Sequence, residues 1–138
     1  MRKFLMTLAL VLGAALSAHA QLSEATLQKR EMHRNMTIKE WNTDARSKTR
    51  WMDHLTRYDA EGRKVEEAEY TQYGQKWRET YEYGENDKIV KEVVYGENNK
   101  PELIRKYEYD ASNRKMKQYN YAPNGKLLHT KVFEYIVN

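Results

Sequence analysis

The sequence predicts an all-β protein: an open, single-layer antiparallel β-meander of about seven to eight strands, with a short N-terminal helix or arm. Three observations lead to this fold class. Segments rich in Tyr, Val, Thr and Ile recur between short polar loops. Loops this short connect only antiparallel neighbours. Glu and Lys fall on both faces of these segments, so neither face is dry enough for a second sheet to pack on it.

The first twenty residues predict a Sec-type signal peptide. Arg2 and Lys3 precede an apolar run over residues 4–16, and Ala18 and Ala20 supply the small residues of a cleavage site. We expect cleavage after Ala20 and a mature protein that is periplasmic or secreted. The apolar run is shorter than the ~20 residues that a spanning helix needs, so we expect no membrane span in the mature form.

Composition narrows the function classes. The chain has no Cys, and therefore no disulfide framework and no thiol nucleophile. Of its 24 basic residues, Arg2 and Lys3 belong to the leader, which leaves 22 basic against 20 acidic residues in the mature chain. The two signs are interleaved rather than gathered in a basic stripe, so we expect no nucleic-acid partner.

We divide the chain into a signal peptide (1–20), an N-terminal helix or arm with a possible first strand (21–48), and a Tyr-rich β-hairpin repeat domain (49–138). Leu22, Leu27 and Met32 have helical spacing, which indicates a short helix or a loose arm. Residues 34–42, "RNMTIKEWN", are a possible eighth strand. The seven strands of the repeat domain are expected at 50–58, 64–73, 76–83, 88–95, 101–109, 114–121 and 126–137.

Five copies of one turn unit connect these strands. Each begins with Tyr, has Gly, Asn or Asp four positions later, and has Arg or Lys at the fifth position. Gly, Asn and Asp most readily adopt the positive φ that turns the chain into its return strand. The five pairs are Tyr58 and Arg63, Tyr83 and Lys88, Tyr95 and Lys100, Tyr109 and Arg114, and Tyr121 and Lys126.

Each pair is expected to form a structural clasp. A four-residue loop would place the Tyr opposite the basic residue, with the cationic group over the ring. The alternative is that Lys and Arg only keep the loops soluble. Extending this pairing along the strands places Val90 opposite Tyr81, Met116 opposite Tyr107 and Leu128 opposite Tyr119.

Further features of the sheet follow from the same pattern. Lys88 and Tyr95 are an odd number of positions apart along one strand, where side chains alternate between faces. The clasps of Tyr83 and Tyr95 are therefore expected on opposite faces. A two-residue loop beginning at Gly74 is expected between two strands, and "WNTDAR" reads as a degenerate turn unit with Arg46 in the basic position. The C-terminal "KVFEYIV" is the most apolar strand, expected to pack under the N-terminal segment or to protect an edge.

At "RYDAEGRK" and "YEYDASNRK" the sequence resembles the YD repeat of bacterial Rhs and teneurin-type proteins. Tyr58, Asp59, Gly62 and Arg63 match that pattern, whereas the second copy has Asn113 in place of Gly. The resemblance implies β-hairpin repeats without catalytic residues, in a chain too short for the shells that Rhs repeats build. The whole mature chain is similar to small secreted Bacteroidetes proteins of uncharacterised function, a resemblance that implies the fold and no activity.

The chain is therefore expected to be a non-enzymatic binding or interaction module, with a polysaccharide or another envelope protein as its ligand. The alternative is a structural or assembly protein that uses its sheet edges. No catalytic constellation, metal site or cofactor is expected, because His33, His54 and His129 have no metal-ligand spacing. Aromatic rings are the candidates for stacking on a glycan, with packing of the sheet as the competing role. These rings are Trp51, Trp77, Tyr81 and Tyr107.

Overall fold

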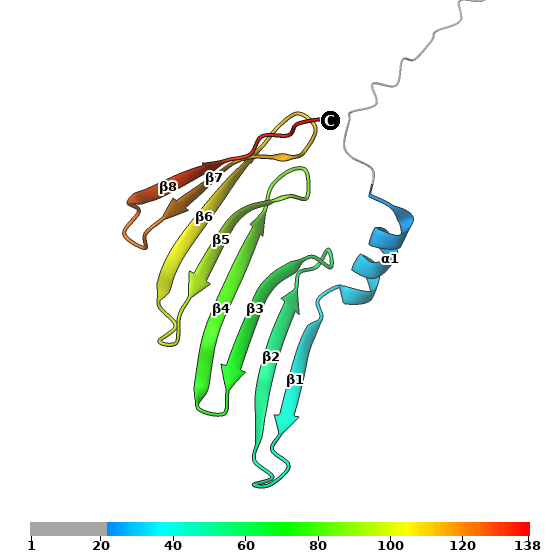
Figure 1. The fold of residues 1–138 in the computed structure, drawn as a ribbon. Helices are drawn as coiled ribbons and strands as arrows, with labels where there is room; N and C mark the ends of the chain where they lie inside the picture. The colour runs from blue at the N-terminus through cyan, green and yellow to red at the C-terminus, as the bar shows by residue number, and fades with distance from the viewer. Residues whose placement is uncertain (1–21) are drawn as a thin grey trace, which may run out of the picture.

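The computed structural model describes residues 22–138, which form one eight-stranded antiparallel sheet and one short helix. Strand order follows chain order from β1 to β8 (Figure 1). The elements are α1 (Glu24–His33), β1 (Thr37–Thr43), β2 (Arg50–Tyr58), β3 (Lys64–Thr71), β4 (Gly74–Tyr83), β5 (Ile89–Tyr95), β6 (Pro101–Tyr109), β7 (Lys115–Tyr121) and β8 (Leu127–Val132). This confirms the predicted open β-meander with an N-terminal helix. The predicted signal peptide lies outside the described residues.

The N-terminal end of the sheet agrees with the expectation from the sequence, and the C-terminal strand is shorter than expected. The possible eighth strand exists as β1, and α1 is capped by Ser23, whose hydroxyl oxygen accepts from the Thr26 amide at 3.2 Å. Strand β8 is shorter than the predicted 126–137. Beyond Val132 the chain stays beside β7 through one backbone bond, from the Phe133 amide to the Met116 oxygen at 3.1 Å.

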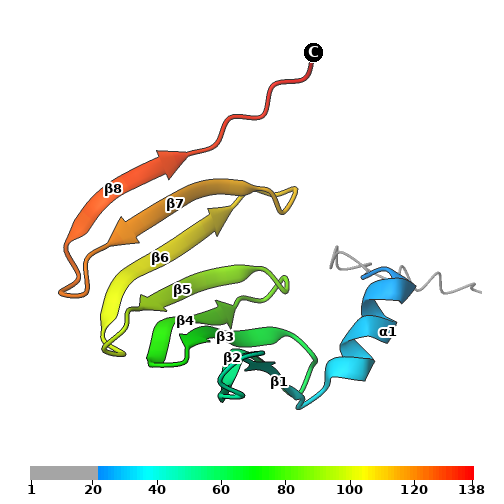
Figure 2. The ribbon, with the colours of Figure 1, turned by 60° about the horizontal axis from the view of Figure 1, so that its bottom comes forward.

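The sheet has very little buried core. Among residues 22–138, the buried hydrophobic side chains are Ala68 and Tyr107, and the buried polar ones are Thr56 and Asn120. The sheet also curls along its width, so that β8 is rotated relative to β1 (Figure 2). Stability in a sheet this thin comes from backbone pairing and from half-buried side-chain stems that cover one another.

The five repeated loops share one geometry, which differs by one residue from the predicted one. In the first of them, the Asp59 amide donates to the Arg63 oxygen at 2.9 Å, and the Gly62 amide donates to the Asp59 oxygen at 3.0 Å. Equivalent bonds close the other four loops. The basic residue therefore lies opposite the residue after the Tyr, not opposite the Tyr. The expected positive φ is confirmed at Gly62, Asp87, Asn99, Asn113 and Gly125.

A β-bulge follows each of these loops. Tyr83 pairs with Ile89 and Glu82 with Lys91, which leaves Val90 as the extra residue. The predicted cross-strand pairs of Val90, Met116 and Leu128 are therefore wrong, because each of these residues occupies the bulge. In the observed register Tyr81 lies opposite Glu92, Tyr107 opposite Gln118, and Tyr119 opposite Thr130.

The clasp tyrosines nevertheless alternate between the two faces, as predicted. Tyr95 lies opposite Arg78, which is five residues from Tyr83 along β4 and hence on the other face. The loop geometry shifts the cross-strand pairing by one residue, and the bulge shifts it by one more. Each shift alone would move the following tyrosine to the other face, so together they leave it on the predicted face. We call the two sides of the sheet the Tyr83 face and the Tyr95 face. Tyr58, Tyr83 and Tyr109 share the first, and Tyr95 and Tyr121 share the second.

The two remaining loops correct the predictions made for them. The loop between β3 and β4 has two residues, as expected, but they are Gln72 and Tyr73, and Gly74 already begins β4 with φ 140°. Between β1 and β2 the positive φ falls on Lys48. There Arg50, rather than Arg46, lies over the ring of Trp41, 4.3 Å from its centroid.

Asp87 fixes α1 against the loop end of the sheet. Its carboxylate accepts from Arg30 of α1 at 3.0 Å and from Arg63 of the β2–β3 loop at 2.9 Å. A Cβ atom added at Gly62 would clash with the Arg30 carbonyl oxygen, so helix and loop are in close contact. The helix therefore packs on the β2–β3 and β4–β5 loops, and the His33 ring stacks on Tyr58 with centroids 4.5 Å apart.

Candidate functional site

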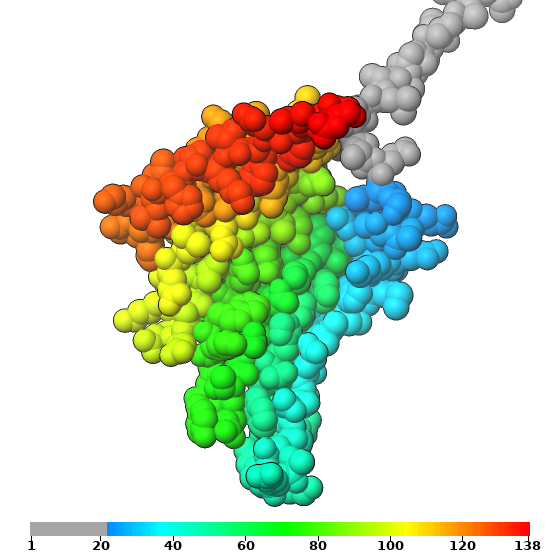
Figure 3. All heavy atoms as spheres, in the orientation of Figure 1, coloured from blue at the N-terminus to red at the C-terminus, as the bar shows by residue number. Residues whose placement is uncertain are grey.

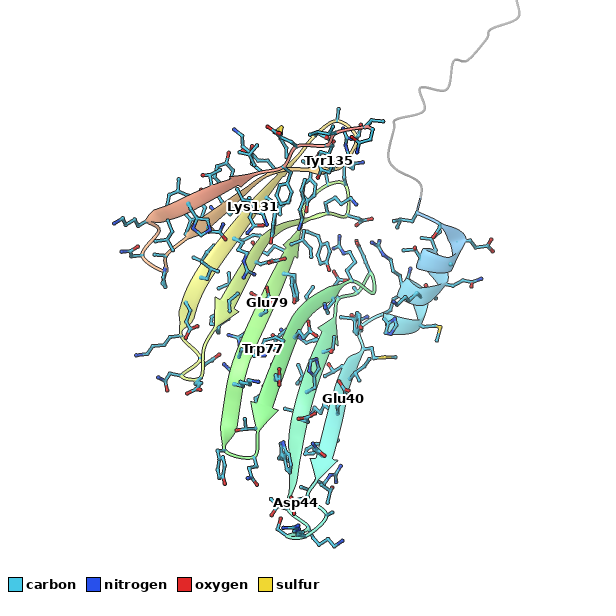
Figure 4. All side chains as sticks on the ribbon, viewed as in Figure 1. Glu40, Asp44, Trp77, Glu79, Lys131 and Tyr135 are labelled. Atoms are coloured by element: carbon cyan, nitrogen blue, oxygen red, sulfur yellow. The ribbon has the colours of Figure 1, made fainter. Side chains whose placement is uncertain are left out.

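The middle of the Tyr83 face carries most of the aromatic residues proposed from the sequence. The register places Trp77, Tyr81 and Tyr107 on this face, and Trp51 on the same face toward the β1–β2 loop. Figure 4 shows Trp77 and Glu79 in the middle of the sheet, on β4. The structure thus gathers three of the four candidate rings from β4 and β6, with Trp51 on β2 nearer the sheet end.

At the centre of this face one cation joins two carboxylates. The Arg105 guanidinium donates to Glu79 at 3.2 Å and to Glu92 at 3.1 Å, and the Tyr107 hydroxyl also donates to Glu92, at 2.9 Å. Burial, followed by the nearby charge of Glu92, raises the pKa of Glu79 above its usual range. Burial raises the pKa of Tyr107 as well, so its hydroxyl stays protonated.

Toward β2 and β3 a second carboxylate organises the same face. Glu67 accepts from Lys64 at 2.8 Å and from the Tyr81 hydroxyl at 3.2 Å, and the His54 Nε2 lies 3.1 Å from it. The hydrogen bond from Lys64 lowers the pKa of Glu67. The neighbouring Trp77 indole donates to Glu69 at 2.7 Å. The polar groups of these rings are therefore engaged within the sheet.

This arrangement limits what the predicted rings can offer to a ligand. Tyr107 is only 9% exposed, and the donors of Trp77, Tyr81 and Tyr107 are bound to carboxylates. Trp51 differs, because its buried Nε1 has no hydrogen-bond partner among the described residues. It borders a shallow depression of about 390 Å³, which is lined by Trp51, Asp53, Glu69, Tyr70, Thr71, Gln72, Tyr73 and Lys76. Within residues 22–138 no cluster of three or more His, Asp and Glu is placed to hold a metal ion.

The predicted clasps do not form within their own hairpins. Arg63 lies over Tyr83, 4.7 Å from the ring centroid, instead of over Tyr58, and Arg114 lies over Tyr135 at 4.6 Å instead of over Tyr109. The rings of Tyr95 and Tyr121 are covered by Arg78 and Lys106. In the described part of the chain no such contact involves Lys88, Lys100 or Lys126. The reason is the loop geometry, which places the basic residue opposite the residue after the Tyr.

The two Arg residues of the loops have a different local partner. Arg63 Nε donates to Asp59 at 2.9 Å, and Arg114 Nε donates to Asp110 at 3.0 Å. The same Asp also accepts from the Arg backbone amide in both loops. The sequence contains a signal for this pairing, because Arg follows only where Asp comes directly after the Tyr, whereas Lys follows Gly or Ala.

A longer repeat emerges from the structure. Tyr58, Tyr83, Tyr109 and Tyr135 are spaced 25, 26 and 26 residues apart and lie at the same end of the sheet. The last three each donate a hydroxyl hydrogen bond to a backbone oxygen beside the preceding Tyr: to Lys64 at 2.6 Å, to Ile89 at 2.5 Å and to Lys115 at 2.7 Å. The repeating unit is therefore two strands, which "YEY", "YEY" and "FEY" at 81–83, 107–109 and 133–135 mark in the sequence.

Strand β8 forms an open edge. All six of its residues are exposed, including Leu127, Leu128 and Val132. The following residues Ile136 and Val137 are 77% and 96% exposed. Figure 3 shows the C-terminal strand lying across one end of the molecule (red), and Figure 4 shows Lys131 and Tyr135 on this segment. Two roles were expected for "KVFEYIV": packing under the N-terminal segment or protecting an edge. The first is wrong, because within residues 22–138 β8 pairs with β7 alone, at the other end of the sheet from β1, and β8 itself forms the edge.

Comparison with known proteins adds no family. No family model and no curated protein matches the chain. A crystal structure of a mutant S. aureus TarM, in complex with fondaparinux, alpha-GlcNAc-glycerol and UDP, aligns with 76% of this chain and 24% of the TarM chain. The identity is 18% and the TM-score is 0.31, a level from which no conclusion about fold or function is drawn. The helix in residues 22–138 is too short to cross a bilayer.

Proposed function

We propose that this protein is a non-enzymatic interaction module of the periplasm or cell exterior, and that it binds an extended polypeptide strand along β8. The observation that carries the proposal is the β8 edge, which no strand of residues 22–138 covers and which ends the sheet with exposed Leu127, Leu128 and Val132. An edge strand presents unpaired backbone N–H and C=O groups that another strand can satisfy. No Pro, Gly or acidic residue interrupts β8.

The repeat supports this choice of surface. β2, β4 and β6 each hold one strand on the edge that corresponds to the free edge of β8, and those strands are β3, β5 and β7. The same edge chemistry therefore binds an antiparallel strand three times within this chain. Strand addition draws its affinity from main-chain hydrogen bonds and its specificity from alternate side chains.

A peptide experiment tests the proposal. The probe is a synthetic peptide of residues 115–121, the β7 sequence, added to dilute isotope-labelled protein. We expect slower hydrogen exchange at the β8 amides, because the peptide pairs with them. A matched peptide with Pro at the position of Gln118 lacks one backbone donor and should give less protection. Unchanged exchange in β8 at millimolar peptide would overturn the proposal.

A second candidate function is glycan binding beside Trp51, and the unpartnered indole nitrogen next to a shallow depression favours it. Binding of the purified protein to a panel of bacterial, host and plant polysaccharides tests it. Saturable binding that is lost in Trp51→Ala and retained in Trp77→Ala is the expected result, because Trp77 already donates to Glu69. Absence of binding across the panel would remove this candidate.

A further inference from the structure

We propose that the strand added to β8 is β1 of a second copy of this chain, so that copies join edge to edge in one continuous sheet. This inference rests on the proposed function, since it names the occupant of the β8 edge. Strand β1 is the other uncovered edge of the sheet: its outer side pairs with no strand in the described chain, and six of its seven residues are exposed.

The two edges are complementary halves of a junction that the chain already contains three times. The two-strand period makes β8 equivalent to β2, β4 and β6, and makes β1 equivalent to β3, β5 and β7. The junctions β2–β3, β4–β5 and β6–β7 each pair one strand of the first kind with one of the second. A junction between β8 and β1 of the next copy would be the fourth of this series.

The pairing within the chain fixes the register of that junction. Glu40 lies opposite His54 of β2, and Gln118 lies opposite Lys131 of β8. Lys131 occupies in β8 the position that His54 occupies in β2. Glu40 therefore corresponds to Gln118, and Lys39 corresponds to Lys117. Applied to β8, the register of β6–β7 places Glu134 opposite Lys39 of the next copy.

Charge complementarity supports this register. The equivalent pair has opposite charges in each junction inside the chain: Arg57 with Glu66, Glu82 with Lys91, and Glu108 with Lys117. Glu134 with Lys39 continues the series. Opposite charges on directly facing strand positions stabilise a sheet, whereas like charges destabilise it.

The neighbouring positions agree as well. Val132 would face Trp41, an exposed apolar pair on the Tyr95 face, where Lys106 faces Tyr119 in the third junction. Phe133 would face Glu40, just as Tyr81 faces Glu92. The helix leaves this part of the edge accessible, because α1 contacts the β2–β3 and β4–β5 loops through Arg30, and Lys39, Glu40 and Trp41 are exposed. The contact joins two different surfaces, so it grows by further addition or closes into a ring.

Charge reversal tests the junction. Sedimentation velocity of the purified protein over a concentration series should show self-association. Glu134→Lys and Lys39→Glu should each weaken it roughly tenfold, because each places like charges opposite one another. A mixture of the two variants should restore association, since each then meets a complementary edge. Glu97→Lys makes the same charge change in the β5–β6 loop and should have no effect.

Cysteine pairs locate the contact, because the chain has no native Cys. Under mild oxidation, a mixture of Val132→Cys and Trp41→Cys proteins should form a mixed disulfide dimer.

The proposal would be overturned by a protein that stays monomeric at all concentrations, or by a Lys39→Glu variant that associates as the wild type does. Association that is lost in Glu134→Lys alone, with Val132→Cys cross-linking to itself, would assign the edge to a symmetric β8–β8 pair. If the β7 peptide protects β8 while the protein remains monomeric, strand addition stands and only the second copy is excluded.

Discussion

The hydroxyl group of Tyr83 donates a 2.6 Å hydrogen bond to the backbone oxygen of Lys64, the residue directly opposite Tyr58. One tyrosine thus ties its own hairpin to the preceding one. Arg63 covers the same ring, 4.7 Å from its centroid. Because Tyr109 and Tyr135 repeat the hydroxyl bond, these tyrosines link successive hairpins of a sheet that has almost no buried core.

Removing these hydroxyl groups should loosen the sheet step by step. We expect Tyr83→Phe and Tyr109→Phe each to lower the free energy of unfolding by about 1 kcal/mol, since each leaves a half-buried carbonyl without its partner. Urea denaturation measures the change. Tyr73→Phe is the control, because that side chain is 90% exposed and should cost nothing. Equal stability of all three variants would contradict a role for these bonds.

Gly62 and Gly125 should respond differently to substitution by Ala. Both have positive φ, 74° and 89°, so each substitution carries a backbone cost of roughly 1 kcal/mol. Only at Gly62 does the new Cβ atom also meet the backbone of Arg30. Gly62→Ala should therefore displace α1 and cost more than Gly125→Ala in thermal unfolding. Similar melting temperatures for the two variants would show that the helix is not held at this loop.

Acid should release α1 from the loops. Hydrogen bonds from Arg30 and Arg63 outweigh the effect of burial and lower the pKa of Asp87. A carboxylate with a lowered folded-state pKa stabilises the fold fully above its unfolded pKa of about 4, and this stabilisation is lost as the pH falls through the folded-state value. The ring chemical shifts of Tyr58, on which His33 stacks, should change in that range. Asp87→Asn should show the released shifts already at pH 7.

Glu79 should have the opposite pH dependence. Its pKa is raised by burial and by Glu92, so its ionisation disfavours the folded state. This penalty is absent below the unfolded pKa and complete above the folded-state pKa. Glu79→Gln should therefore gain stability relative to wild type as the pH rises from 4 to 7. A stability difference that does not vary with pH would show that the Arg105 ion pair fully compensates the burial of Glu79.

Local chemistry explains what could be predicted from the sequence. Gly62, Asp87, Asn99, Asn113 and Gly125 were identified because positive φ depends on the residue itself and on its immediate neighbours. The short loops then determined an antiparallel order, and the mixture of charges on both faces predicted a single layer. The same local reading placed Arg63 over Tyr58, because the loop was assigned one residue too few: its backbone bonds place Arg63 opposite Asp59 and Lys64 opposite Tyr58. The bulge after this pair likewise leaves no clear mark in composition.

The sequence by itself determined the class, order and approximate extent of the strands, since turn residues and strand propensity act over a few neighbouring positions. Only the tertiary structure decided that Arg63 covers Tyr83, that Asp87 holds α1, and that within residues 22–138 no strand covers β8 or the outer side of β1. Each of these depends on residues from different hairpins meeting in space, through the bulges and the curl of the sheet. The 26-residue period depends on both the sequence and the structure. It is present in the sequence as "YEY" and "FEY", but it is recognised as a structural repeat only when the register shows that alternate hairpins share a face.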